Sequence, residues 1–293
     1  MVQCINMNLR EIIESAEQSK TAIGHFNISN LEGLHAVFNA ARELEVPVII
    51  GTSEGERDFM GLEQAVALVR SLREKYKYPI FLNADHTYSV ERVEEAVRAG
   101  YDSVIIDGAQ LSYEENIAMT REAVKKAKAI NPNVLVEAEH GFIGTSSKLL
   151  EEIPKGANVS EEFYTNPEEA ERFVKETGID LFAPSVGNLH GLLKHSKNPR
   201  LSIERIRAIR QSTGVPLVLH GGSGISDDDF KSAITAGISI IHISTEIRLA
   251  FRTTLEKELE EKKDEIAPYK FMKRPKEAME AVVKNRLKLF NNL

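Results

Sequence analysis

The sequence predicts a (β/α)8 TIM barrel of the α/β class with a C-terminal helical extension. Eight short runs rich in Val, Ile, Leu and Phe alternate with longer amphipathic segments, and most of the runs are apolar throughout. Near-continuous apolar strands are typical of a parallel sheet covered by helices, and eight βα units close a barrel. An open doubly wound sheet is the alternative, but it usually begins with a glycine-rich turn, where this chain has GHFNIS.

The predicted elements follow one another in regular order. Strands are expected at 22–26, 47–51, 79–83, 103–106, 134–138, 181–186, 216–219 and 238–243. The clearest helical patterns cover 89–98, 112–129, 167–176 and 203–211. Glycines at 100, 178, 214 and 237 stand where helix C-caps precede the next strand. This repeated order of strand, helix and glycine supports the barrel.

Two segments interrupt the alternation. The polar connection from 141 to about 165 is longer than a βα loop needs to be, which indicates an active-site flap or a surface loop. The extension from about 256 to 293 holds a charged helix, a Pro-Tyr break, the basic string KFMKRPK and a final amphipathic helix. Such an extension packs on its own barrel or on a partner subunit. Because no linker-like stretch divides the chain, we expect one domain over residues 1–293.

Composition restricts the classes of function. The 293 residues are 42% hydrophobic and 28% charged, which is ordinary for a globular protein, and the net charge of −7 disfavours nucleic-acid binding. No stretch is apolar enough to span or target a membrane. Cys4 is the only cysteine, so an internal disulfide and a thiolate metal cluster are excluded. We therefore expect a cytoplasmic protein without a membrane or nucleic-acid partner.

Polar residues follow almost every predicted strand, at the end of a barrel where chemistry occurs. His86, His190 and His220 each follow an apolar run, and Asp85 precedes the first of them. A single histidine there is more often a packed residue, but three that converge must bind something or satisfy their hydrogen bonds. Three imidazoles with an open position are the ligand set of a catalytic zinc, and an adjacent carboxylate is a ready proton carrier. The pattern predicts a metal-dependent enzyme.

The last two strands lead into segments suited to a phosphate. HGGSG at 220–224 precedes a helix that begins near Ser226, and Ser244 and Thr245 precede another. In barrels of this kind, backbone N–H groups and helix N-termini after the seventh and eighth strands hold the anion. Lys194 offers a charge to the same phosphate, with an ordinary surface lysine as the alternative. A phosphorylated substrate is expected.

Taken together, these segments resemble the class II, zinc-dependent ketose-bisphosphate aldolases, the family of fructose-bisphosphate and tagatose-bisphosphate aldolases. The resemblance covers essentially the whole chain and is carried by NADH (83–86), VIIDGAQ (104–110), VEAEHG (136–141), GNLHGLLK (187–194), LVLHGGSG (217–224) and ISTEIRLAF (243–251). It implies a lyase of carbohydrate metabolism and glycolysis. This enzyme would cleave fructose 1,6-bisphosphate, or tagatose 1,6-bisphosphate, reversibly to dihydroxyacetone phosphate and glyceraldehyde 3-phosphate.

The resemblance also implies roles for individual residues. His86, His190 and His220 would hold Zn²⁺, and Asp85 would exchange a proton with the C4 hydroxyl. Glu139 would be an alternative metal ligand or a ligand of a second site, and Asp107 would belong to that second site. The second site would hold a second metal or a monovalent cation. The residues implied to cradle or adjoin the substrate phosphate are Gly191, Lys194, Gly221, Ser223, Ser244 and Thr245, with Asn27 and Ser53 nearby. Members of the family are dimers or tetramers, so Lys273 or Arg274 would reach the second phosphate in a homodimer or homotetramer.

Four departures from the family pattern lie in the active site. Asn83 replaces a histidine, His140 a hydrophobic residue, and Thr145, Ser146 and Ser147 the acidic residues of the flap. His242 replaces the asparagine that contacts the enediolate. Our hypothesis is that His242 either takes over the hydrogen bond of that asparagine or recruits a metal, with altered substrate preference. Proton transfer would then use water, Glu161 or Glu162 in place of the flap acids.

Three functions remain open on the sequence. The first is a zinc aldolase acting on a ketose phosphate. The second is a related zinc barrel with a different sugar phosphate or aldehyde, and the third is a catalytically impaired sugar-phosphate-binding protein, which the altered flap would suit. Retention of Asp85 with all three histidines favours the first.

Overall fold

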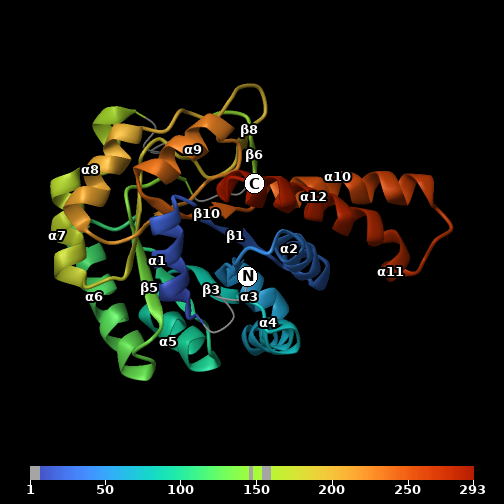
Figure 1. The fold of residues 1–293 in the computed structure, drawn as a ribbon, viewed down its shortest axis with the longest axis horizontal. Helices are drawn as coiled ribbons and strands as arrows, with labels where there is room; N and C mark the ends of the chain where they lie inside the picture. Colours follow the sequence, from blue (N-terminus) through green and yellow to red (C-terminus); the bar gives the residue numbers. More distant parts are fainter. Residues whose placement is uncertain (1–6, 145–147, 154–159) are drawn as a thin grey trace.

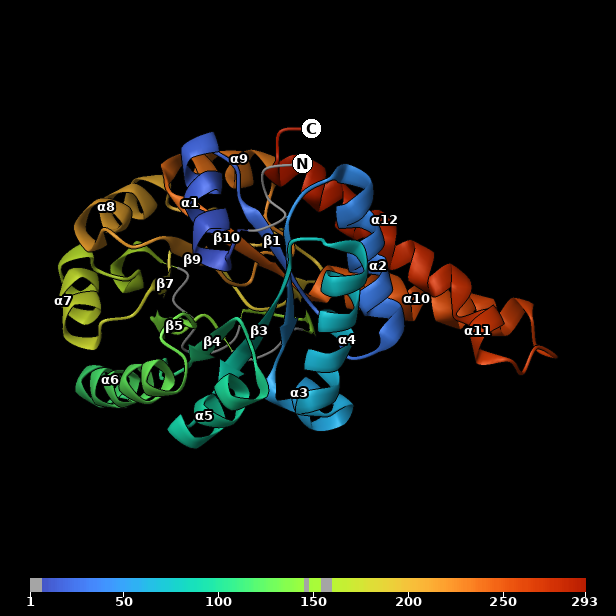
Figure 2. The ribbon, with the colours of Figure 1, turned by 60° about the horizontal axis from the view of Figure 1, so that its bottom comes forward.

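The computed structural model describes residues 7–144, 148–153 and 160–293, and its centre is a closed parallel barrel. Around the barrel the strands follow the order β1-β10-β9-β7-β5-β4-β3-β2. The barrel strands are β1 (Ile23–Asn27), β2 (Val48–Thr52), β3 (Ile80–Thr87), β4 (Ser103–Ile106), β5 (Leu135–His140), β7 (Leu181–Pro184), β9 (Leu217–Leu219) and β10 (Ile238–Ile243). Figures 1 and 2 show the helices arranged around these strands. The predicted (β/α)8 fold class is confirmed.

Helices α2 to α9 lie between the barrel strands along the chain and cover the outside of the barrel, and α10 follows the last strand. The helices are α1 (Leu9–Ser19), α2 (Leu31–Leu44), α3 (Glu54–Met60), α4 (Leu62–Tyr76), α5 (Val90–Ala99), α6 (Tyr113–Ile130), α7 (Pro167–Thr177), α8 (Ile203–Thr213), α9 (Asp227–Ala236), α10 (Thr245–Glu261), α11 (Pro268–Phe271) and α12 (Lys273–Phe290). The four glycines that were predicted as C-caps end α5, α7, α8 and α9. None of the helices in the described ranges is both long and apolar enough to cross a membrane.

The barrel interior changes from apolar to polar along its axis. Its N-terminal end is closed by α1, whose Leu9, Ile12 and Ile13 pack on an inner layer that includes Phe81 and Ile240. The outer faces of the strands pack against the surrounding helices in one continuous core. Side chains two residues further along a strand point to the same face, so the next inward positions form a second layer nearer the C-terminal end. That layer carries histidine, asparagine and glutamate side chains, and it underlies the site.

The C-terminal extension is an antiparallel pair of helices that stands out from the barrel (Figure 1). Helix α10 runs from Thr245 to Glu261 without a break near 256, so the extension begins as a continuation of the last barrel helix. Helix α12 returns along α10 and packs against α2. Arg274 forms ion pairs with Glu258 at 2.8 Å and Glu261 at 2.7 Å, which join α12 to α10 within the chain.

The flap contributes a small second sheet. Strands β6 (Leu149–Leu150) and β8 (Leu192–Leu193) pair in parallel, so the flap is joined to the segment that carries His190. A short 3-10 helix, η1 (Glu161–Phe163), follows. Glu161 and Glu162 are exposed there and do not line the pocket described below. Cys4 and the flap residues Thr145, Ser146 and Ser147 lie outside the described residues.

Candidate active site

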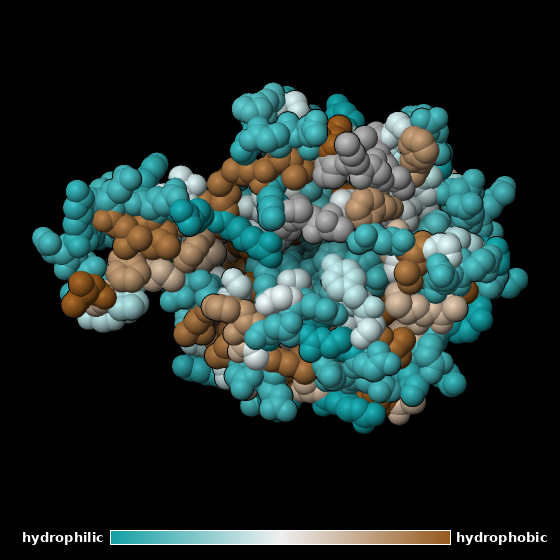
Figure 3. Space-filling model, turned by 180° about the vertical axis from the view of Figure 1, so that it is seen from behind, coloured by the Kyte–Doolittle hydropathy of each residue, from teal (hydrophilic) through white to brown (hydrophobic). Residues whose placement is uncertain are grey.

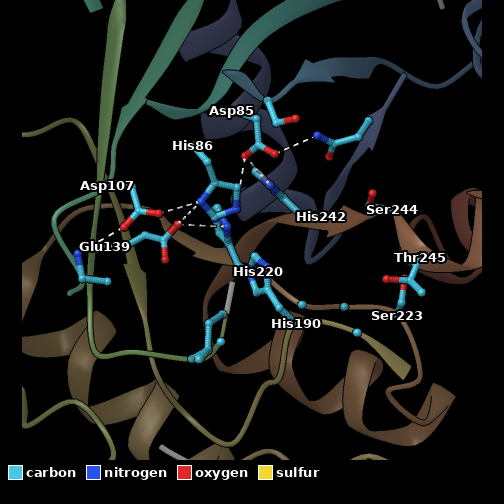
Figure 4. A pocket seen from close by; sticks show the side chains of 18 of the residues that line it. Asp85, His86, Asp107, Glu139, His190, His220, Ser223, His242, Ser244 and Thr245 are labelled. Atoms are coloured by element: carbon cyan, nitrogen blue, oxygen red, sulfur yellow. Dashed lines mark hydrogen bonds and ion pairs between the residues drawn. The ribbon is translucent and has the colours of Figure 1, made fainter. Parts of the chain in front are cut away.

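A polar pocket opens at the C-terminal end of the barrel (Figure 4). It draws residues from all eight barrel strands or the loops that follow them. Fourteen of the predicted site residues line it, namely Asn27, Ser53, Asp85, His86, Asp107, Glu139, His190, Gly191, His220, Gly221, Ser223, His242, Ser244 and Thr245. Lys194, Lys273 and Arg274 do not line it. The positions that the sequence placed at strand ends therefore meet in one pocket.

The three predicted metal ligands converge in this pocket. One nitrogen from each of His86, His190 and His220 can be chosen so that all three atoms lie within 4.8 Å of one another. His190 Nε2 and His220 Nδ1 are buried and have no hydrogen-bond partner, although a buried polar atom normally has one. Burial, with the charges of neighbouring histidines, lowers the pKa of His190 to about 3, so its ring is neutral and able to bind a metal.

Carboxylates orient two of these imidazoles. His220 Nε2 lies 2.7 Å from Glu137 Oε1, and His86 Nδ1 lies 2.9 Å from Asp107 Oδ2. If each of these nitrogens donates its proton to the carboxylate, His220 Nδ1 and His86 Nε2 are left as free ligand atoms. Protein zinc sites use this arrangement of imidazole and outer carboxylate. The donor set fits Zn²⁺: three imidazoles, which would bind the metal in their neutral form, no thiolate, and space in the pocket for substrate.

Glu139 and Asp107 lie on the other side of His86. Glu139 Oε1 is 3.1 Å from His86 Nδ1 and 3.3 Å from His220 Nδ1, and it has no hydrogen-bond partner. His86, Asp107 and Glu139 form a second group whose ligand atoms lie within 4.8 Å of one another. Burial would raise the pKa of Asp107, but its hydrogen bond with His86 lowers it. The geometry thus brings together both residues that were expected at a second cation site.

Asp85 is buried between the predicted metal ligands and the far wall of the pocket. Its Oδ2 accepts a hydrogen bond from Asn27 Nδ2 at 2.8 Å, and its Oδ1 lies 3.5 Å from His242 Nδ1 and 3.9 Å from His86 Nε2. Burial alone would raise the pKa of this carboxyl group, but the charge of His86 and the hydrogen-bonding group of His242 hold it well below its usual value. Asp85 is therefore an ionised base.

The segments that are expected to bind a phosphate lie beside the pocket. Ser226 is the N-cap of α9 and Ser244 the N-cap of α10, so both helix N-termini lie beside the pocket loops. Ser244 Oγ is buried and has no hydrogen-bond partner, which leaves it available to an anion. A Cβ at Gly221 would lie 2.5 Å from Leu189 O, and Gly221 has φ +61°, so only glycine fits this turn.

Two of the four departures lie away from the pocket surface. The ring of His140 packs on Phe173 and Tyr113, with centroids at 5.8 and 5.0 Å. It is next to Glu139 along β5 and so faces the outer helices, which explains why a hydrophobic residue would also fit there. Asn83 is buried inside the barrel and hydrogen-bonds to Ser103 and His25. Only His242 is both a departure and a lining residue among the described positions.

The sequence missed several residues of the site. Arg248, Tyr88 and Glu54 line the pocket from helices or loops, beyond the strand ends on which the prediction concentrated. Arg248 pairs with Glu56 at the rim. His25 is buried directly beneath the pocket, and its polarity within an apolar strand was the only available signal. Lys194 forms an ion pair with Glu151 of the flap, and its role at a phosphate stays a prediction.

Comparison with known proteins agrees with this geometry. The family model for fructose-bisphosphate aldolase class-II matches residues 7–293. The chain is 36% identical to a fructose-bisphosphate aldolase of Helicobacter pylori over 96% of this chain and 97% of that protein. It is also 36% identical to a probable fructose-bisphosphate aldolase of Bacillus subtilis over 98% of each. The crystal structure of the YdjI aldolase from Escherichia coli K12 superposes with a TM-score of 0.81 at 32% identity, covering 97% of this chain and 96% of that chain.

Proposed function

The chain belongs to the class II fructose-bisphosphate aldolase family and is a carbon–carbon lyase, and from this premise we propose that it is a zinc enzyme acting on fructose 1,6-bisphosphate. Tagatose 1,6-bisphosphate, which differs at C4, is the second substrate to consider. The products are dihydroxyacetone phosphate and glyceraldehyde 3-phosphate, and the reaction is reversible. The observation that carries the proposal is the convergence of three imidazoles beside the ionised carboxylate of Asp85.

The metal would be held by His86, His190 and His220. When bound there, Zn²⁺ supplies a Lewis acid that stabilises the negative charge that cleavage leaves on the three-carbon fragment. Glu137 orients His220 and Asp107 orients His86, so the ligand atoms are directed before the metal arrives. Glu139, with Asp107, is available for an alternative metal position or for a monovalent cation.

Asp85 performs the proton transfer in this proposal. In the cleavage direction its Oδ1 accepts the proton of the C4 hydroxyl, the C3–C4 bond breaks, and the electron pair of that bond moves toward the C2 carbonyl. Transfer of this proton needs a base that is ionised and that points at the C4 hydroxyl. Asn27 holds the other carboxylate oxygen, which leaves Oδ1 for the substrate. His242 Nδ1 lies 3.5 Å from Oδ1 on the same side, where it would take the role of the family's asparagine.

The phosphate of dihydroxyacetone phosphate would lie among the loops after β7, β9 and β10. Gly191, Gly221 and Ser223 line one side of that space, and Ser244 and Thr245 at the N-terminus of α10 line the other. Backbone N–H groups and the positive end of the helix favour an anion here. Lys194 would bind the phosphate after its ion pair with Glu151 is broken. Ser53 lines the pocket and donates a hydrogen bond to Glu56.

We also propose a homodimer or homotetramer of single-domain subunits in the cytoplasm. The projecting helices carry exposed apolar side chains, among them Leu259, Ile266 and Tyr269, and Figure 3 shows the brown spheres gathered there. Exposed apolar patches of this kind mark association surfaces. Lys273 forms no ion pair with any of the described residues and is therefore freer than Arg274 to reach a partner's phosphate.

The test is a cleavage assay on both epimers. Zinc-loaded protein is incubated with fructose 1,6-bisphosphate or tagatose 1,6-bisphosphate, and the release of triose phosphate is followed with a coupled dehydrogenase. We expect cleavage of both, with the higher kcat/KM for fructose 1,6-bisphosphate. Cleavage of neither compound by protein that contains stoichiometric zinc would contradict the proposed function.

A further inference from the structure

Two buried imidazoles lie face to face next to Asp85. His25 on β1 and His242 on β10 are neighbours in the sheet register, and their ring centroids are 3.5 Å apart with an angle of 4° between planes. His242 also stacks on His220, with centroids 4.0 Å apart and an angle of 29°. The ring of His242 is therefore clamped between one proposed metal ligand and His25. His25 does not line the pocket, so any effect of this residue on the reaction must pass through its neighbours.

The ring of His25 occupies a space that exists because residue 51 is a glycine. A Cβ on Gly51 of β2 would lie 2.1 Å from His25 Cε1 and 2.6 Å from His25 Nε2. These distances are far below any contact between nonbonded atoms, so the ring occupies the space that a side chain at Gly51 would fill. His25 thereby reaches across β2 to Asn83 on β3. The absence of a side chain at residue 51 is what permits the stack.

Hydrogen bonds fix the orientation of His25. Asn83 donates through Nδ2 to Ser103 Oγ at 2.7 Å, which turns Asn83 Oδ1 toward His25 Nε2 at 3.2 Å. An amide oxygen only accepts, so His25 Nε2 carries the proton. The ring is thus anchored at one edge by Asn83 and offers a flat face to His242. Ser103, Asn83 and His25 form a polar chain that crosses the barrel and ends at this face.

The clamp determines which atom His242 presents to Asp85. His242 Nδ1 lies 3.5 Å from Asp85 Oδ1, and because that carboxylate only accepts, Nδ1 is the protonated nitrogen. An asparagine at residue 242 would present its amide without a platform, whereas the wider imidazole must be held in one plane to aim the same donor. A rotation of the ring would withdraw Nδ1 from Asp85 and move bulk into the pocket.

From these contacts we infer that His25 is a positioning residue for the aldol step. Its ring holds His242 in the plane that directs Nδ1–H at Asp85 Oδ1, and Asn83 and Gly51 are the parts of the barrel that make this possible. The inference rests on the proposed function of Asp85 as the base. It predicts that His25 affects turnover only while His242 is present.

A double-mutant cycle on the zinc-loaded enzyme tests this coupling. The variants are His25→Gln, His242→Asn and the two together, and kcat and KM for fructose 1,6-bisphosphate are measured for each. We expect His25→Gln to lower kcat about 10- to 100-fold with KM within about twofold, because misplacing a group by about 1 Å can lower the rate by up to about 100-fold. In the His242→Asn background the same change should alter kcat by less than about twofold. An equal loss of kcat in both backgrounds would overturn the inference.

A second variant separates the ring from its hydrogen bond. His25→Phe keeps a flat stacking face and loses the donor to Asn83, whereas His25→Gln keeps a donor and loses the face. We expect the Phe variant to retain at least about tenfold more of the wild-type kcat than the Gln variant. Equal losses would contradict a role for the stacked face. Zinc content and thermal unfolding are measured on each variant, so loss of metal or of the fold is recognised.

The ¹⁵N chemical shifts of His242 give a readout that does not depend on turnover. In wild-type enzyme they should identify the tautomer protonated at Nδ1, and in the His25→Gln variant a mixture of tautomers. An Nε2-protonated ring in wild type would overturn the inference. If the wild-type enzyme cleaves neither bisphosphate, the proposed function fails instead, and the shifts still report whether His25 holds His242.

Discussion

Asp85 and His86 are consecutive residues of β3, yet both side chains face the pocket. Along a regular strand, neighbouring side chains point to opposite faces, so one of the two would face the outer helices. The pairing of β3 with β4 shifts by one residue between Ala84 and Thr87, and His86 has φ +41°. One extra residue in a strand bends it and re-aims a side chain, and such irregularities occur near active sites. The proposed base and a proposed metal ligand thus come from adjacent positions.

The buried guanidinium of Arg57 holds this irregular segment. Its Nη1 donates to Asp85 O at 3.0 Å and to Thr52 O, and its Nη2 donates to Thr87 Oγ1 at 3.0 Å. The carbonyl groups released from the ladder therefore have a donor, as buried carbonyls require. Helix α3, which follows Ser53, places Arg57 behind the site. The backbone strain at His86 is offset by hydrogen bonds from Arg57 of α3.

Replacement of Asp85 by Asn should abolish most of the cleavage activity. Asn has nearly the same shape but no charge, so it accepts no proton from the C4 hydroxyl. We expect kcat for fructose 1,6-bisphosphate to fall about 10²- to 10⁴-fold, the usual contribution of a general base. Zinc content and the thermal unfolding temperature should remain close to those of the wild type. Full activity in a variant with normal zinc content would remove Asp85 from the mechanism.

Replacement of Glu137 by Gln should weaken zinc binding. Glu137 is 1% exposed and its Oε1 lies 2.7 Å from His220 Nε2, so the charge that strengthens this ligand would be lost. Changes in such outer carboxylates weaken metal affinity about 10- to 100-fold, and we expect the lower end because Gln still accepts a hydrogen bond. Competition with a chromophoric chelator measures the Kd. Glu171→Gln, on the exposed face of α7, is the control; an unchanged Kd in Glu137→Gln would contradict the assigned orientation of His220.

A side chain at Gly51 should destabilise the protein. The new Cβ of Gly51→Ala would lie 2.1 Å from the ring of His25, which is itself packed against His242. We expect the free energy of unfolding in urea to fall by about 1–3 kcal/mol, the usual cost of overpacking a core. Gly55→Ala is the matched control, since no atom outside its neighbours lies within 4 Å of its Cβ position. Equal stability of the two variants would show that the space beside His25 is not tight.

A charge on the projecting helices should dissociate the proposed oligomer. Ile266 lies between α10 and α11, and its side chain is 87% exposed in the single chain. Burial of such a side chain at an interface contributes about 1.5–3 kcal/mol, and an aspartate there adds a desolvation cost. We expect Ile266→Asp to reduce the mass measured by light scattering after size exclusion to that of one chain. Lys263→Asp is a control on the same arm. An oligomer of unchanged mass in both variants would argue against this surface as the interface.

The sequence predicted the barrel because its strands are buried on both faces. Such strands read as continuous apolar runs, and seven of the eight ended within about two residues of their predicted limits. The predicted end of the third strand was wrong. It was expected to end at Asn83, but β3 continues to Thr87. The extra residue that keeps Asp85 and His86 in the strand leaves no mark on hydrophobic periodicity. Bulges depend on contacts such as those of Arg57, which are distant in sequence.

The pocket could be predicted wherever its residues follow strands, since strand ends meet on one rim. Arg248 was missed because it lies one turn into α10, where an arginine is ordinary. His25 was missed because it lies inside a strand, and its partners Gly51 and Asn83 belong to other strands. Lys194 was predicted from its position alone, but its charge also attracts Glu151 of the flap. Contacts between strands and charge pairing across loops required the three-dimensional structure.

The zinc dependence of cleavage is tested most directly by removing the metal and adding it back. Purified protein is assayed with fructose 1,6-bisphosphate as isolated, after EDTA treatment and gel filtration, and after stepwise addition of Zn²⁺. We expect EDTA to abolish the release of triose phosphate and about one equivalent of Zn²⁺ to restore it, since His86, His190 and His220 would form one ligand set. Cleavage that persists at the original rate in protein shown to be free of metal would contradict this expectation.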